Sequence, residues 1–205
     1  MKLKRLGLIA LFLAIFATAC SGGGSEEFVL AGYERVPEPT VGTVSLPQVN
    51  HDGGDFTFRA DPGKLLMVNF GYSNCPDICP TTLADTRIAF NQLGERANEV
   101  DFAFVSIDPE RDTEEVLSNY VEAFLADGIA VRTADQDELA IAADAFGVFY
   151  DIRENDAGDL EVAHTPNVFL VDESGSIVLT WPSGVPAADI VNDLTILLDR
   201  GPAQT

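Results

Sequence analysis

Cysteine, histidine and basic side chains are scarce in this sequence, and each scarcity narrows what the chain can do. Three cysteines in 205 residues are too few to build the disulfide framework of a small secreted domain. The 12 lysines and arginines are outnumbered by 33 acidic residues, which gives a formal net charge of -21. Such a surface repels nucleic acid phosphates, so we exclude nucleic acid as a partner. Hydrophobic residues still make up 46% of the chain, which is enough for one sizeable core.

A short apolar run near the N-terminus predicts a targeting segment. The run, Leu6 to Phe16, follows three basic residues and is shorter than the ~20 residues that a membrane-spanning helix needs. It ends in Ala17-Thr18-Ala19 before Cys20, which resembles the bacterial lipobox, in which the cysteine becomes the lipidated N-terminus. We therefore expect a lipoprotein-type signal peptide over residues 1–19 and a lipid anchor on Cys20. The alternative is an ordinary signal peptide cut near Ala19, with Cys20 incidental.

The rest of the chain divides into a linker and one domain. Ser21 to Ser25 has the composition of a flexible linker. Glu26 to Val41 contains two prolines and no clear periodicity, so we expect an extended lead-in that lies along the domain. We place the anchor, linker and lead-in at 20–41, the folded domain at 42–200 and a tail at 201–205. This arrangement predicts a domain tethered to a membrane.

Strand and helix patterns alternate along the domain. Apolar runs bounded by turn residues predict strands, and recurring apolar positions three and four apart predict helices. The expected strands are 44–49, 55–59, 65–70, 100–107, a short one at 131, 167–172 and 177–180, and the expected helices are 83–93, 112–126, 135–146 and 186–198. The order predicts an α/β fold, with one layered sheet flanked by helices on both faces and an extra N-terminal β-hairpin.

The strongest chemical signal is Cys75-Pro76-Asp77-Ile78-Cys79-Pro80, which follows a buried strand and opens a helix. Residues four apart share a helix face, so the two sulfurs can converge on one point. A helix N-terminus favours thiolate, the form that attacks disulfides and binds metals. The three-residue spacer differs from the Cys-x-x-Cys of oxidoreductases and favours metal binding. The alternatives are two inert buried cysteines or a static disulfide between them.

Three segments together resemble the Sco (SenC) family of copper proteins. The run from Phe70 to Leu83, FGYSNCPDICPTTL, is similar to the family's signature, and 106–113, SIDPERDT, is similar to its second conserved stretch. His164, two residues before Pro166, stands where the family has its histidine ligand. The resemblance extends from roughly Gly32 to Leu198 and covers nearly the whole expected domain.

The resemblance implies a thioredoxin-like fold that binds one copper ion through Cys75, Cys79 and His164. It also implies assembly of the CuA centre of cytochrome c oxidase, with oxidase subunit II as the partner and a periplasmic copper donor as a further one. Soft thiolates suit Cu(I), and an added imidazole lets the site hold Cu(II). With an anchor at Cys20, the expected location is the extracytoplasmic face of the bacterial cytoplasmic membrane.

A second function is compatible with the same residues. The pair Thr165-Pro166 is closer to the thiol-exchanging redoxins than to most copper-binding members of the family. A thiol-disulfide oxidoreductase that keeps the oxidase cysteines reduced therefore remains an alternative function. Peroxide reduction is a weaker third alternative, because that chemistry usually has a different motif around the attacking cysteine. By the same comparison we expect Pro166 to be cis and to face the cysteines. Asp77 is expected to orient the site or contact a partner, or alternatively to cap the first turn of the helix. His51 is interpreted as a solvated turn residue and Trp181 as a packing residue.

Overall fold

The computed structural model describes residues 29–158 and 160–201, so the expected signal peptide, Cys20 and the linker lie outside the described residues. The strands are β1 (Ser45–Gln48), β2 (Gly54–Thr57), β3 (Leu65–Gly71), β4 (Val100–Ser106), β5 (Ile129–Val131), β6 (Tyr150–Glu154), β7 (Leu160–His164), β8 (Val168–Val171) and β9 (Ile177–Trp181). The helices are α1 (Ile78–Leu93), α2 (Glu114–Phe124), α3 (Gln136–Phe146) and α4 (Ala187–Arg200), with a short 3-10 helix at Gly94–Glu99.

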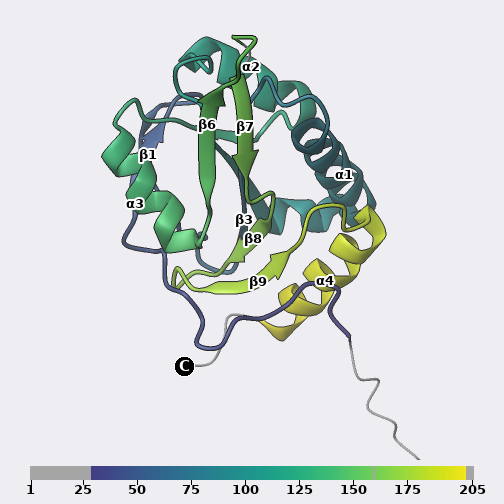
Figure 1. The fold of residues 1–205 in the computed structure, drawn as a ribbon. Coiled ribbons are helices and arrows are strands. Elements are labelled where there is room, and N and C mark those ends of the chain that lie inside the picture. Colours follow the sequence, from purple (N-terminus) through teal and green to yellow (C-terminus); the bar gives the residue numbers. More distant parts are fainter. Residues whose placement is uncertain (1–28, 159, 202–205) are drawn as a thin grey trace, which may run out of the picture.

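One seven-stranded sheet forms the centre of the domain, in the order β2-β1-β5-β4-β3-β8-β9 (Figure 1). β3, β4 and β5 are parallel, while β8, β9 and the β1–β2 hairpin add antiparallel edges. Every residue of β3 is buried, as expected of a central strand covered on both faces. The predicted mixed sheet with flanking helices and an N-terminal hairpin is therefore confirmed.

Helices cover both faces of this sheet. On one face α1 packs against both α2 and α4, and α3 covers the other (Figure 1). The last ring of α3, Phe146, makes edge-on contacts with three rings of the sheet layer: Phe58, Phe70 and Phe169. Aromatic pairs in this geometry stabilise a core by about 0.5–1.5 kcal/mol each beyond their buried area.

Two helices begin where the sequence predicts. Thr113 caps α2, because its hydroxyl accepts a hydrogen bond from the Val116 N–H at 3.2 Å. The carboxylate of Asp135 caps α3 by accepting from the N–H groups of Asp137 and Glu138. Both caps confirm the predicted helix starts to within two residues.

The lead-in lies along the domain, as expected. Tyr33 bridges to Thr180 of β9, and the buried carboxylate of Asp193 accepts hydrogen bonds from the Ala31 N–H and the Trp181 indole N–H. Trp181 is 1% exposed, which confirms it as a packing residue. The lead-in is thus tied to α4 and β9 through one buried acid.

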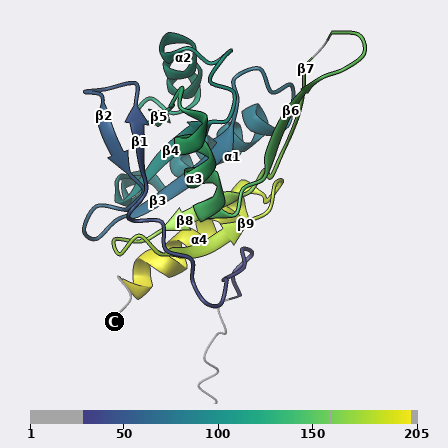
Figure 2. The ribbon, with the colours of Figure 1, turned by 60° about the vertical axis from the view of Figure 1, so that its left-hand side comes forward.

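A hairpin absent from the predicted map leaves the main sheet after α3. β6 and β7 form a separate two-stranded sheet, and Figure 2 shows it projecting from the body of the domain. Its last residue is His164, so one of the three expected copper ligands lies at the base of this projection. Over residues 29–158 and 160–201, no helix combines the length and apolar character needed to cross a membrane.

Candidate metal centre

The two cysteines lie together at the carboxyl end of β3. The Cys75 N–H donates to the carbonyl of Tyr72 at 3.2 Å, and the Cys79 N–H donates to the Cys75 sulfur at 3.3 Å. Their side chains are also hydrogen-bonded to one another. Both are free thiols rather than a disulfide, and both are buried, at 8% and 1% exposed. The sequence-based expectation that the sulfurs converge at a helix start is met.

Gly71 lets β3 pass close to the thiols. A Cβ on this residue would lie 2.7 Å from Cζ of Phe104 and 2.8 Å from the sulfur of Cys79, closer than real contacts allow. Burial, together with the hydrogen bond to Cys75, raises the pKa of the Cys79 thiol. Cys79 is therefore a protonated thiol at neutral pH until a metal ion or a base displaces its proton.

A buried carboxylate holds the loop before Cys75. Asp112 is fully buried and accepts hydrogen bonds from the Ser73 N–H at 3.1 Å, from the Ser73 hydroxyl, and from the Ser106 hydroxyl at 2.6 Å. Ser106 ends β4 and Ser73 follows β3, so one acid links the ends of two neighbouring strands. Hydrogen bonds to a charged acceptor are shorter and stronger than neutral ones. Asp112 therefore fixes the backbone from which Cys75 projects.

The segment that carries Asp112 is itself braced. Arg132 donates from Nε to the Asp112 carbonyl at 2.6 Å and from Nη2 to the Pro109 carbonyl at 2.9 Å. Asp108 and Arg111 form an ion pair within the same segment. This is the stretch over 106–113 that the sequence singled out, and its structural role is to support the thiol loop.

Tyr72 touches both the thiols and the histidine. Its hydroxyl is hydrogen-bonded to the side chain of Cys75, and its ring packs edge-on against the imidazole of His164, with 5.9 Å between centroids. The guanidinium carbon of Arg111 lies 5.6 Å from the centroid of the Tyr72 ring. Burial and the neighbouring thiols raise the pKa of Tyr72 to about 12, so the phenol stays protonated at neutral pH.

His164 presents a nitrogen without a partner. It is half-buried opposite Tyr150 in the β6–β7 hairpin, and its Nε2 is buried with no hydrogen-bond partner among the described residues. Burial lowers the pKa of His164, which favours the neutral imidazole. A neutral imidazole with a free nitrogen is the form that binds metal ions. The donor set of two thiols and this nitrogen fits a soft ion such as Cu(I).

The structure brings together two of the three expected ligands. In the part of the chain that it describes, no three His, Cys, Asp or Glu side chains are gathered closely enough to hold a metal ion. Cys75 and Cys79 are in contact, whereas His164 reaches them through Tyr72. The three-residue ligand set therefore stays a prediction.

One expectation about the supporting residues is wrong, and one alternative for Asp77 is excluded. The Thr165–Pro166 bond is trans, since the only cis peptide bond among the described residues is Val36–Pro37. Thr165 continues the hairpin pairing, with hydrogen bonds to Phe149 in both directions at 2.8 and 3.1 Å, so the chain enters β8 already extended. Asp77 occupies the N-cap position of α1, but its exposed side chain makes no capping hydrogen bond, so the capping alternative is wrong and a role in orienting the site or contacting a partner stays a prediction.

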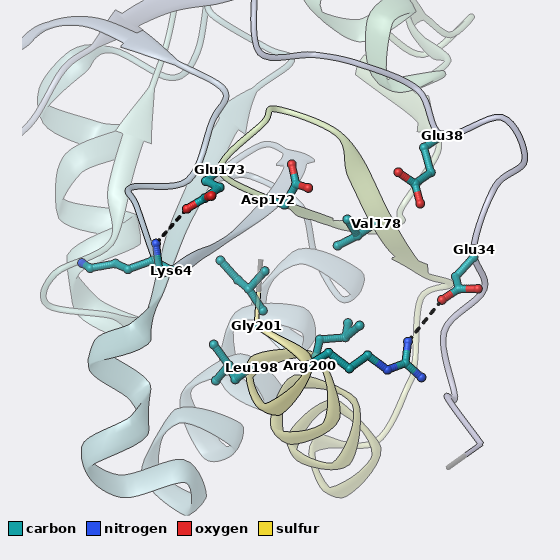
Figure 3. Close-up of a pocket in the computed structure, with 12 residues that line it drawn as sticks. Glu34, Glu38, Lys64, Asp172, Glu173, Val178, Leu198, Arg200 and Gly201 are labelled. Atoms are coloured by element: carbon teal, nitrogen blue, oxygen red, sulfur yellow. Dashed lines mark hydrogen bonds and ion pairs between the residues drawn. The ribbon is translucent and has the colours of Figure 1, made fainter. Parts of the chain in front are cut away.

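Other residues are placed away from the thiols. His51 lies in the β1–β2 turn, exposed as expected, and its Nε2 is 3.1 Å from the Gly128 carbonyl oxygen. A pocket of about 200 Å³ lies near Lys64 and Leu65, at the opposite end of β3 from Cys75 (Figure 3). Its rim includes the ion pair between Arg200 and Glu34, and it contains none of the expected ligands.

Sequence reasoning missed the residues that support the thiols and the histidine. Tyr72, Arg111 and Asp112 all contact the site; they lie in the two segments that carry the family resemblance, but the sequence assigned no role to any of them. The available signal was their position, since each follows a buried strand that ends at the same edge of the sheet.

Known proteins match this chain in sequence and in structure. The SCO1/SenC family model matches residues 41–199, which include Cys75, Cys79 and His164. A SCO2-like protein of Rickettsia felis is 32% identical over 155 residues, covering 69% of this chain and 75% of that protein. The apo Sco1 protein of Thermus thermophilus has a TM-score of 0.69 at 29% identity, over 83% of this chain and 98% of that one. Bradyrhizobium japonicum ScoI, solved with copper bound, has a TM-score of 0.65 at 28% identity, over 74% and 96% of the two chains.

Proposed function

The chain belongs to the SCO1/SenC family, and on that premise we propose that it carries copper for assembly of the CuA centre of cytochrome c oxidase. The observation that carries the proposal is the pair of free, mutually hydrogen-bonded thiols at the carboxyl end of β3. Across Tyr72 from them lies a buried imidazole nitrogen that has no hydrogen-bond partner among residues 29–158 and 160–201. Two soft sulfurs and a neutral nitrogen form a donor set suited to copper.

In this proposal copper is the cargo, and each ligand has a distinct task. Cys75 and Cys79 give up their protons and bind the ion as thiolates, so binding strengthens as the pH rises. His164 supplies the third ligand through Nε2, for which the described part of the chain offers no competing hydrogen bond. Exposed groups beside the thiols, among them Asp77 and Ile78, are available to contact a receiving subunit. Transfer then proceeds by exchange of these ligands for those of oxidase subunit II.

Anaerobic titration of the reduced chain with Cu(I) and Cu(II), against a competing chelator, tests the proposal. We expect one copper ion per chain and weakening of more than about tenfold in His164→Ala, because losing a ligand costs more than losing a group that orients one. His51→Ala is the matched control, since it removes the other histidine from a distant turn and should leave the affinity unchanged. Binding that survives in a Cys75→Ser, Cys79→Ser double variant would refute the site.

The same thiols support a second candidate function, reduction of a disulfide in the oxidase subunit. Cys75 loses its proton and attacks one sulfur of the partner disulfide, and the other partner sulfur leaves and takes up a proton. Cys79 then loses its proton and attacks the Cys75 sulfur, so the first partner sulfur leaves and takes up the second proton. The products are a Cys75–Cys79 disulfide and two partner thiols, with two electrons transferred. The free, adjacent state of the two sulfurs favours this chemistry.

A disulfide-form oxidase CuA domain separates the two functions. Stoichiometric reduction of that domain by a chain that binds no copper would favour the reductase and exclude the carrier. Copper transfer to the reduced domain, with loss of transfer in His164→Ala, would favour the carrier, because thiol exchange does not require the imidazole.

We also propose that Cys20 anchors the domain at the extracytoplasmic face of the bacterial cytoplasmic membrane. The short apolar run and Ala17-Thr18-Ala19 before Cys20 support this placement. Membrane fractionation of the expressed chain is the test. Recovery of Cys20→Ser in the soluble fraction, with the unaltered chain in the membrane fraction, is expected, whereas equal behaviour of both would contradict the anchor.

A further inference from the structure

The hydroxyl of Tyr72 is placed to act on one copper ligand. Tyr72 directly follows β3, is 7% exposed, and accepts the Cys75 N–H at its own carbonyl, so backbone and side chain both meet Cys75. The hydroxyl is hydrogen-bonded to the Cys75 side chain. Because a copper-bound thiolate keeps lone pairs on sulfur, it can accept the same hydrogen bond.

The ring that carries this hydroxyl is fixed from two sides. Arg111 lies over it at 5.6 Å and is held in turn by its ion pair with Asp108. The His164 imidazole packs against it edge-on at 5.9 Å. A cation close to the aromatic face interacts favourably with the ring and restrains its movement. The hydroxyl is therefore held at Cys75 instead of turning to solvent.

A donor on a thiolate ligand changes which oxidation state of copper the site prefers. Sulfur donates electron density to the metal, and Cu(II) needs more of that density than Cu(I) does. A hydrogen bond to the sulfur withdraws part of it, and hydrogen bonding around a cysteine sulfur is one of the ways in which proteins set copper potentials. Loss of the donor should therefore strengthen Cu(II) binding relative to Cu(I).

We infer that Tyr72 is a positioning residue that biases the bound ion toward Cu(I), through the hydrogen bond from its hydroxyl to the Cys75 sulfur. The inference rests on the proposed copper function. In this role Tyr72 helps to keep the bound copper as Cu(I), the oxidation state that two soft thiolates already favour.

Tyr72→Phe in the full chain tests the inference, because it removes one oxygen and keeps the ring. Tyr120→Phe is the matched control: the Tyr120 hydroxyl is also buried near the thiols but has no hydrogen-bond partner among the described residues. Dissociation constants for Cu(I) and Cu(II) are measured separately by chelator competition. The sulfur-to-copper absorption band of the Cu(II) form and the thermal unfolding midpoint are recorded for each protein.

For Tyr72→Phe we expect the ratio of the Cu(II) to the Cu(I) dissociation constant to fall about tenfold, a decrease of 59 mV in potential. The absorption band should move to longer wavelength, and Tyr120→Phe should change neither quantity. An equal loss of both affinities, or an unchanged ratio, would overturn the inference while leaving the copper function intact. Failure of the unaltered chain to bind either ion would overturn the proposed function and this inference together.

Discussion

Replacing Asp112 by Asn should loosen the loop that carries Cys75. The carboxylate receives three hydrogen bonds, from the Ser73 N–H, the Ser73 hydroxyl and the Ser106 hydroxyl. Asn has the same shape as Asp and keeps one acceptor oxygen, but it replaces the other oxygen by an NH₂ group, which faces hydrogen-bond donors. The negative charge of the carboxylate is also lost. Hydrogen bonds to charged groups contribute about 1.5–3 kcal/mol each, and part of this is offset by the cost of burying the charge. We expect Asp112→Asn to lower the free energy of unfolding by about 1–3 kcal/mol.

Urea unfolding of the metal-free chain measures this loss, with the denaturant slope as the check that the transition itself is unchanged. Asp85→Asn is the control, because Asp85 lies near the site on α1 and has no hydrogen bond or ion pair among those found for the described residues. A second readout is alkylation of Cys75, which should become several-fold faster in Asp112→Asn as the loop opens. A change in stability below about 0.5 kcal/mol, with unchanged alkylation, would refute the reasoning.

Three further predictions concern single positions. Gly71→Ala should destabilise the chain by about 1–3 kcal/mol and weaken copper binding, because the added carbon meets Phe104 and the Cys79 sulfur; urea unfolding and titration check this. Below pH 6.5 the free energy of unfolding of the metal-free chain should fall, because the pKa of His164 is lowered on folding and the unfolded chain binds the proton first; His164→Gln should remove that part of the pH dependence. Asp193→Asn should release the lead-in, seen as faster proteolysis near Ala31, while copper affinity stays unchanged.

The predicted map is accurate where burial imposes a pattern. β3 and β4 are almost wholly buried, and their continuous apolar runs are visible in the sequence. The N-cap residues Thr113 and Asp135 can also be predicted from the sequence, because a cap depends only on the residues of the first helical turn. The β6–β7 hairpin was missed because its alternation of apolar and polar residues covers only three or four positions in each strand and no residue of either strand is fully buried.

The same distinction explains which part of the candidate metal site was predictable. Cys75 follows a central parallel strand, and the carboxyl ends of such strands are where α/β sheets place their sites, so sequence position alone located the thiols. Asp112 follows the neighbouring strand β4 and reaches the same edge for the same reason. The sequence does not predict what Asp112 does, because its role depends on the hydroxyls of Ser73 and Ser106, which donate hydrogen bonds to it.

His164 is positioned by a different part of the fold, so its place in the sequence does not predict how close it lies to the thiols. It ends a hairpin that lies outside the main sheet, so no strand register of that sheet fixes its distance from the thiols. Its approach is set by contacts at the hairpin base, where Thr165 pairs with Phe149 and the imidazole meets Tyr72. Two of the proposed ligands are thus held by the core, and the third lies at the base of a projection, where it contacts Tyr72. We therefore expect completion of the proposed three-ligand site to depend on how Tyr72 and the hairpin base hold the imidazole.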